Sequence, residues 1–126
     1  MVDAVTSQTL VDGARNVVMK FTNLSDGTGE SAVKKVDVSG LNDAPATVKI
    51  ERILYDVAGM VVTILWDADT DVRCIELGAN TGELDFRRFG GLINNAGTGV
   101  TGDINFTTTG HTNGDSYSII LEMAKN

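Results

Sequence analysis

Apolar and polar side chains alternate along most of this chain, which is typical of β-strands that bury one face. In residues 16–23, "NVVMKFTN", the side chains of Val17, Met19 and Phe21 point to one side and their neighbours to the other. Clusters of Gly, Asn, Asp and Thr separate such stretches at short intervals, as turns between antiparallel strands do. The pattern predicts about nine strands and very little helix.

These strands fit a single all-β domain over residues 1–126. We predict an antiparallel β-sandwich, and a jelly roll is one of the Greek-key arrangements that the pattern permits. The predicted core consists of inward positions of the alternating stretches: Val17, Met19, Phe21, Ile64, Trp66, Ile104, Phe106, Ile119 and Leu121.

Two stretches in the middle of the chain predict particular features. The apolar phase of residues 47–57, "TVKIERILYDV", slips by one position, which indicates a β-bulge near Glu51 or Arg52. Residues 59–66, "GMVVTILW", are apolar on both faces with one exception, so we expect a central strand covered on each side, with Trp66 as a core anchor. Further strands are predicted over residues 32–38, 72–77 and 83–89.

Net charge, hydropathy and cysteine count exclude several classes of partner and cross-link. Seventeen acidic against ten basic residues give a net charge of −7, the wrong sign for a protein that must neutralise phosphates, so we expect no nucleic-acid partner. The chain shows neither a basic leader with an apolar run nor a stretch approaching the ~20 apolar residues that span a bilayer. We therefore expect no signal peptide and no membrane partner. The single cysteine, Cys74, cannot form an intramolecular disulfide, and its apolar neighbours predict a buried thiol.

Three aspartates at alternate positions, Asp67, Asp69 and Asp71, resemble the opening of a calcium loop. An EF-hand counted from Asp67 needs glycine at its sixth position and glutamate at its twelfth, where this chain has Val72 and Gly78. The sequence therefore predicts a solvent-facing hairpin turn and no metal site. A surface cation held by two of the carboxylates is the alternative.

Two further motifs lack the context that their chemistry needs. Residues 97–102 spell the dinucleotide fingerprint, but no strand leads into them and no helix is expected to follow. His111, the single histidine, lies in a polar loop near Asp115 and Ser116 without a nucleophile elbow. We expect no catalytic residues, no cofactor and no enzyme activity.

Three segments carry a family resemblance: "AVTSQTLVDGARNVVMKFTNLSDGTGES", "ILWDADTDV" and "GGLINNAGTGVTGDINFTTTGHTNGDSYSIILEMAKN". Over nearly its whole length the chain resembles the small virion structural proteins of tailed bacteriophages, marine and cyanobacterial ones in particular. The resemblance implies a decoration or cement protein, made in the host bacterial cytoplasm, that binds the major capsid protein on the head exterior and stabilises the shell. It also implies a homo-oligomer, and a trimer would match a three-fold lattice position.

The longest irregular stretch, residues 90–102, is rich in Gly and Asn and is the candidate binding loop. The candidate partner-binding residues in and beside it are Phe89, Leu92, Ile93, Asn94 and Asn95, with the first three as apolar anchors. The alternative is that these apolar residues plug one end of the sandwich.

The competing function is a phage tail or fibre component, or another β module that binds host glycans. Such a module would also be acidic and all-β. Glycan sites expose aromatic platforms, for which Tyr55, Trp66 and Tyr117 are the candidates, and all three lie in strand patterns.

Overall fold

The structure is a computed structural model that describes residues 4–24, 32–41, 45, 47–110 and 114–125. The described strands are β1 (Ala4–Asp12), β2 (Asn16–Leu24), β3 (Val33–Val36), β4 (Val48–Ala58), β5 (Val61–Trp66), β6 (Val72–Leu77), β7 (Thr81–Asp85), β8 (Ile104–Thr109) and β9 (Ser116–Lys125). Two short 3-10 helices, η1 (Val38–Gly40) and η2 (Arg87–Phe89), complete the described elements.

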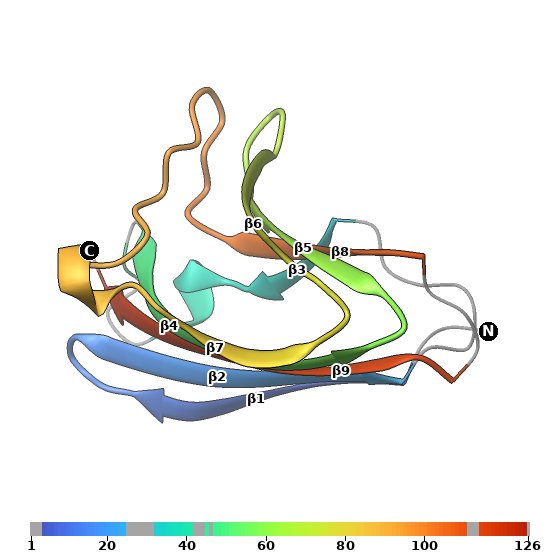
Figure 1. The fold of residues 1–126 in the computed structure, drawn as a ribbon. Helices are drawn as coiled ribbons and strands as arrows, with labels where there is room; N and C mark the ends of the chain where they lie inside the picture. The colour runs from blue at the N-terminus through green and yellow to red at the C-terminus, as the bar shows by residue number, and fades with distance from the viewer. Residues whose placement is uncertain (1–3, 25–31, 42–44, 46, 111–113, 126) are drawn as a thin grey trace.

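The strands form two sheets, with the orders β1-β2-β9-β4-β7 and β3-β8-β5-β6, and every pairing is antiparallel. The sheets face one another as two layers (Figure 1). Without β1, the remaining orders β2-β9-β4-β7 and β3-β8-β5-β6 are those of a jelly roll, the arrangement of two Greek keys wrapped into one sandwich. The predicted all-β sandwich is confirmed, and β1 adds an extra edge strand to it.

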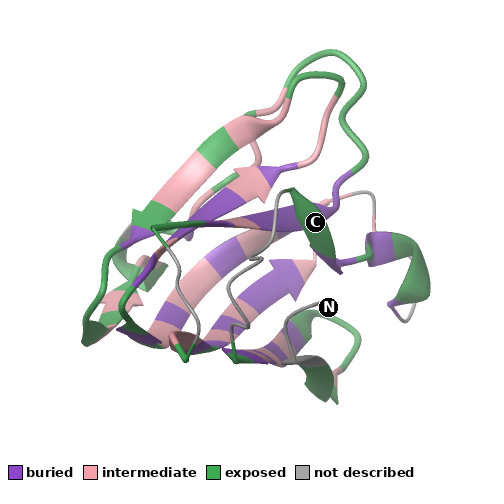
Figure 2. Cartoon of the chain, turned by 90° about the vertical axis from the view of Figure 1, so that its right-hand side faces the viewer, coloured by how far each residue is buried: buried purple, intermediate pink, exposed green. Residues whose placement is uncertain are grey.

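The core lies between the two layers, and the strands of both sheets carry buried residues (Figure 2). All nine residues predicted for the core from alternation are buried. Near its centre the ring of Phe106 meets Phe21 edge-to-face at a centroid distance of 5.2 Å and Tyr117 at 6.0 Å. Such aromatic pairs add stability beyond the burial of their area.

The predicted irregularity of the fourth strand is confirmed. The register between β4 and β9 shifts between Ile50 and Arg52, as a β-bulge requires. The prediction for residues 59–66 holds in part. β5 lies between β8 and β6, and Trp66 is buried, but Val61 and Leu65 on the second face are half-buried because the described chain forms two layers and no third covers them.

Two strands are shorter than the sequence pattern predicts. The strand expected over residues 83–89 begins at Thr81 and ends at Asp85. The Asp85 carboxylate accepts a hydrogen bond from the backbone N of Arg87 at 2.9 Å, which turns the chain into η2. The strand expected over residues 32–38 ends at Val36, because the Asp37 side chain caps η1.

Candidate functional site

Two loops at the same end of the sandwich join into one projection, which we call the tip: residues 67–71, between β5 and β6, and residues 97–103, before β8. Both loops extend beyond the sheets (Figure 1). Backbone hydrogen bonds tie them together: Asp69 N donates to Thr98 O at 3.1 Å and Thr101 N donates to Asp67 O at 3.2 Å. The tip is therefore a built structure rather than two independent loops.

A buried amide anchors the tip to the sheet. Asn105, on β8, is 4% exposed and donates from Nδ2 to Asp67 Oδ1 at 2.9 Å and to Asp71 Oδ2 at 3.1 Å. The Thr101 hydroxyl donates to the second oxygen of Asp67 at 2.7 Å. The predicted turn is confirmed and Asp69 is exposed, but the expectation that all three aspartates face water was wrong, because Asp67 and Asp71 turn inward to this amide.

The electrostatics of the tip follow from these contacts. Hydrogen bonds from Thr101 and Asn105 hold the pKa of Asp67 below its ordinary value of 3.8, against the opposing effect of partial burial. Nearby, Asp103 is buried and its carboxylate meets the amine of Lys34 at 3.0 Å. Across the described ranges, no three His, Cys, Asp or Glu side chains gather in a way that could hold a metal ion.

The glycines of the "GTGVTG" motif serve the tip. Gly99 has a φ of +79°, and the carboxylate of Asp69 fills the space that a side chain at position 99 would need. Gly102 also has a positive φ, of 88°. Strand β8 follows at Ile104, so this motif lacks the helix amino terminus that carries a pyrophosphate.

The predicted anchors face different ways. Leu92 exchanges two backbone hydrogen bonds with Ile50, at 3.1 and 2.7 Å, and its half-buried side chain packs against the core. It acts as the plug that we considered as the alternative. Ile93 points outward and is 68% exposed. Phe89 has its backbone in η2, and its side chain lies outside the described part of the structure.

The two predicted asparagines differ in role. Asn94 accepts a hydrogen bond from the backbone N of Ala96 at 2.9 Å, an Asx-type turn that fixes the course of the loop. Asn95 is exposed. A pocket of about 290 Å³ separates this segment from β6 and is lined by Trp66, Arg73, Cys74, Leu92, Ile93 and Asn95.

Cys74 in this pocket is half-buried, less than its apolar neighbours predicted. Burial raises the pKa of its thiol to about 12, so at neutral pH the group stays protonated and is a poor nucleophile. Beside it, Arg73 is paired with Glu76 at 2.9 Å. The pocket offers apolar contact and a paired cation, with no activated nucleophile among its lining residues.

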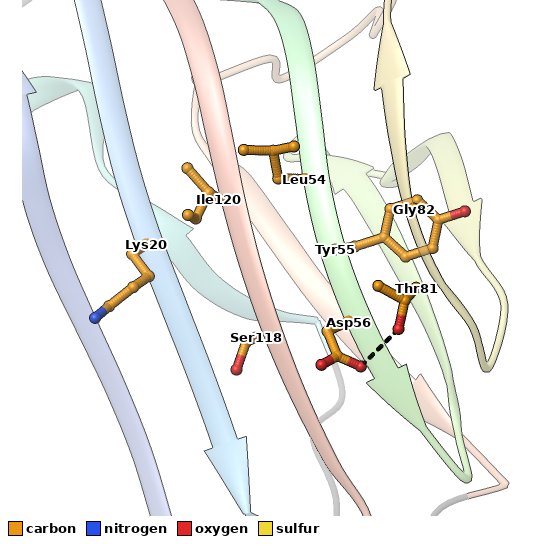
Figure 3. Close-up of a pocket in the computed structure, with 8 residues that line it drawn as sticks. All are labelled: Lys20, Leu54, Tyr55, Asp56, Thr81, Gly82, Ser118 and Ile120. Carbon is orange, nitrogen blue, oxygen red and sulfur yellow. Dashed lines mark hydrogen bonds between the residues drawn. The ribbon is translucent and has the colours of Figure 1, made fainter.

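A second hollow, of about 280 Å³, lies on the outer face of the five-stranded sheet. Figure 3 shows the residues that line it: Lys20, Leu54, Tyr55, Asp56, Thr81, Gly82, Ser118 and Ile120. The Thr81 hydroxyl donates to Asp56 Oδ1 at 3.0 Å. The ring of Tyr55 lies over Gly82 and packs against the core. Trp66 and Tyr117 are each 1% exposed, so neither presents a free ring face on the surface, whereas Tyr55 is half-buried and lines this hollow.

The sequence pattern did not predict several of the residues that build the site. Asn105 and Thr101 carry the contacts that hold the tip, and Val100 adds an apolar side chain that is 43% exposed. An asparagine between two core positions, Ile104 and Phe106, was the available signal, since a polar residue so placed needs hydrogen-bond partners.

A comparison with protein-family models gives no match, and searches of curated proteins and of solved structures give no significant match either. The described residues include no helix that is long and apolar enough to cross a bilayer. His111 lies outside the described residues.

Proposed function

We propose that this chain is a non-enzymatic structural protein of a bacteriophage virion, a decoration or cement protein that binds the major capsid protein on the outer surface of the head. It stabilises the shell after expansion, as a homo-oligomer. The resemblance of three long segments to phage virion proteins motivates this assignment, and a jelly roll suits it without specifying it.

The observation that carries the proposal is the placement of Ile93. A large apolar side chain that is 68% exposed contributes little to the fold, but it can anchor a partner. It stands beside the pocket lined by Leu92 and Asn95, and its backbone is held by the pairing of Leu92 with Ile50. A preorganised anchor of this kind loses little conformational entropy on binding.

The pocket beside Ile93 reaches the base of the tip, because Trp66 and Arg73, which flank residues 67–71, also line it. The tip presents Asp69 and Val100, both exposed, on a framework braced by hydrogen bonds from Thr101 and Asn105. A rigid projection with an acidic side chain and an apolar one suits a complementary depression with basic groups on the shell. We propose that Ile93 and the tip bind the capsid together, and that many weak contacts sum across the lattice.

A tail, fibre or glycan-binding role has weaker support. Sugar recognition commonly uses exposed aromatic rings, but Trp66 and Tyr117 are buried and Tyr55 is half-buried, with its ring packed partly against the core. The hollow of Figure 3 offers Asp56, Ser118 and aliphatic side chains, and the half-buried Tyr55 is the one aromatic residue in its lining.

The test adds purified protein to expanded capsids that lack it. We expect saturable binding limited by the symmetry of the shell, with a rise in the melting temperature of the capsid. The variant Ile93→Ser should weaken binding by about tenfold, equivalent to ~1.4 kcal/mol, while the stability of the free protein stays nearly unchanged.

Val33→Ser is the matched control, because Val33 is an exposed apolar residue, at 39%, on strand β3. It should bind like the wild type. Free protein remaining in solution beside intact, fully stable shells would reject the capsid role. Equal binding by Ile93→Ser and wild type would reject this surface.

A further inference from the structure

Strand β1 forms a free edge of the five-stranded sheet. It pairs with β2 along one side, and the sheet order places nothing on its other side within the described chain. The strand runs for nine residues, "AVTSQTLVD", and carries one charged residue, Asp12. From Ala4 to Thr9 every second residue of this edge directs its backbone N–H and C=O outward, and no described strand pairs with this row of hydrogen-bonding groups. The register shifts between Thr9 and Val11, so the regular row ends there.

The other sheet edges carry the protection that edge strands usually have. β7 has five residues, two of them acidic: Glu83 and Asp85. β3 has four residues and includes Lys34 and Lys35. β6 carries Arg73, which is paired with Glu76. β1 is both longer than these strands and less charged.

The one charge on β1 is already neutralised. Lys125, whose side chain is 6% exposed, places Nζ 2.7 Å from Asp12 Oδ1 and also donates to the Gly13 carbonyl at 2.6 Å. A chain with a net charge of −7 therefore has an electrically neutral edge at this strand. A second acidic copy can approach this edge without the repulsion that the rest of the surface would cause.

Exposed apolar side chains mark both ends of the same edge. Leu10 is 46% exposed and Val11 is 47% exposed near the end of β1, and Leu24, 55% exposed, pairs with Ala4 at its beginning. An antiparallel partner strand reverses direction. It therefore brings Leu10 and Val11 of one copy to the end that carries Leu24 of the other, on both sides of a two-fold axis.

We propose that β1 pairs with β1 of a second copy, antiparallel and about a two-fold axis, so that two five-stranded sheets become one continuous sheet. The second copy is the occupant because the edge is self-complementary: it is neutral, and the two-fold axis brings the apolar end with Leu10 and Val11 of each copy to the apolar end with Leu24 of the other. Isologous two-fold contacts of this kind are the commonest in homo-oligomers. The inference stands independently of the capsid role, and it favours a dimer over the trimer that a three-fold site would accept.

The test uses complementary charges at two exposed positions of β1. Ser7→Lys with Thr9→Lys should weaken the dimer by about a hundredfold or more, because the new charges face their own copies across the axis. Ser7→Glu with Thr9→Glu should do the same. An equimolar mixture of the two variants should restore a dimer, because each strand then meets opposite charges.

The measurement is molar mass by light scattering during gel filtration, over a concentration series. Circular dichroism confirms that each variant is folded. The control variant is Ala79→Lys with Thr109→Lys, which adds two lysines at exposed positions away from β1. This variant should remain dimeric.

Three results would overturn the proposal. The first is a wild type that stays monomeric at every concentration, and the second is a lysine variant of β1 that still dimerises, which would place the contact elsewhere. The third is open-ended growth with concentration, because it indicates pairing of β1 with a different edge of the next copy.

Discussion

Asn105 donates a hydrogen bond from Nδ2 to Asp67 Oδ1 at 2.9 Å, joining residues that are 38 positions apart in the sequence. The same nitrogen reaches Asp71 Oδ2 at 3.1 Å, so one neutral amide lies between two carboxylates. Without that donor the two negative charges would face each other in a half-buried site, where screening is weaker than in water. The amide therefore ties the β5–β6 turn to strand β8 and separates the two carboxylates.

Replacing Asn105 with aspartate should destabilise the protein strongly. The substitution keeps the shape but changes the donor into a third carboxylate, so it removes two hydrogen bonds and adds repulsion. We expect a loss of ~2–4 kcal/mol in the free energy of unfolding at neutral pH, measured by urea titration. Because the new carboxyl group regains a donor when it is protonated, the loss should shrink as the pH is lowered.

Asn80→Asp is the control for this change. Asn80 is exposed and its Oδ1 accepts a hydrogen bond from Thr81 N at 2.8 Å, a role that a carboxylate can also fill. Its unfolding free energy should stay within about 0.5 kcal/mol of the wild type. An Asn105→Asp variant as stable as this control would show that the amide does not hold the tip.

Gly99→Ala should loosen the tip. Its φ of +79° disfavours any side chain, and the Asp69 carboxylate occupies the space for a Cβ. We expect a cost of about 1–3 kcal/mol in thermal or urea unfolding. Gly97→Ala, two residues away, has no atom within 4 Å of its new methyl group and should be nearly neutral. Equal effects from the two substitutions would contradict the close approach of Asp69.

The core could be predicted from the sequence because alternation is local. Successive residues of a strand point to opposite faces, so the apolar residues at alternate positions, such as Val17, Met19 and Phe21, identify its buried face. The partner strand need not be known. The bulge beside Arg52 was equally visible as a slip of phase. Strand order was not predictable, since the pairing of β2 with β9 joins residues about a hundred positions apart.

The pattern also misses β1 and the tip, for different reasons. Residues 7–11 at this sheet edge are all exposed, Leu10 and Val11 among them, so alternating apolar residues mark no buried face there. The tip depends on side-chain hydrogen bonds between distant segments, such as Thr101 to Asp67, which no local pattern encodes. In the candidate site, the sequence pattern nominated residues 90–102 as a binding loop but could not predict which of Leu92 and Ile93 faces outward.

The free energy of unfolding should fall at low pH, partly because the Asp67 carboxylate becomes protonated. Its pKa in the fold lies below the ordinary 3.8, chiefly because Thr101 and Asn105 donate to the carboxylate. A lowered pKa contributes stability above that ordinary value, and the contribution is lost as the pH falls through the folded pKa. Asp67→Asn should therefore be less stable than wild type at neutral pH, and urea titrations should show the gap closing as the pH falls below the ordinary pKa of 3.8. A gap that stays constant over this range would contradict the assignment.

Asp85 should also contribute to the loss of stability at low pH, to a smaller extent than Asp67. Hydrogen bonds from the side chain and backbone of Arg87 lower the pKa of its carboxyl to about 2. The pair lies at the surface, where salt screens it, so raising the salt concentration should reduce its effect on stability. Asp85→Asn measured at low and high salt checks this. A difference from wild type that does not respond to salt would reject the electrostatic explanation.

Calcium should leave the melting temperature almost unchanged. Asp67 and Asp71 are the inward carboxylates of the turn, and both are already satisfied by the Asn105 amide, which would have to leave for a cation to enter. The Asp69 carboxylate packs against Gly99 and its backbone N is bonded to Thr98 O at 3.1 Å, so it cannot complete an oxygen cage without rebuilding the tip. A ligand at 100 times its dissociation constant would add about 2.7 kcal/mol to stability, a shift that calorimetry resolves easily. Melts in millimolar calcium and in chelator should therefore coincide, and a calcium-dependent rise that disappears in Asp71→Asn would show that the turn is a metal site.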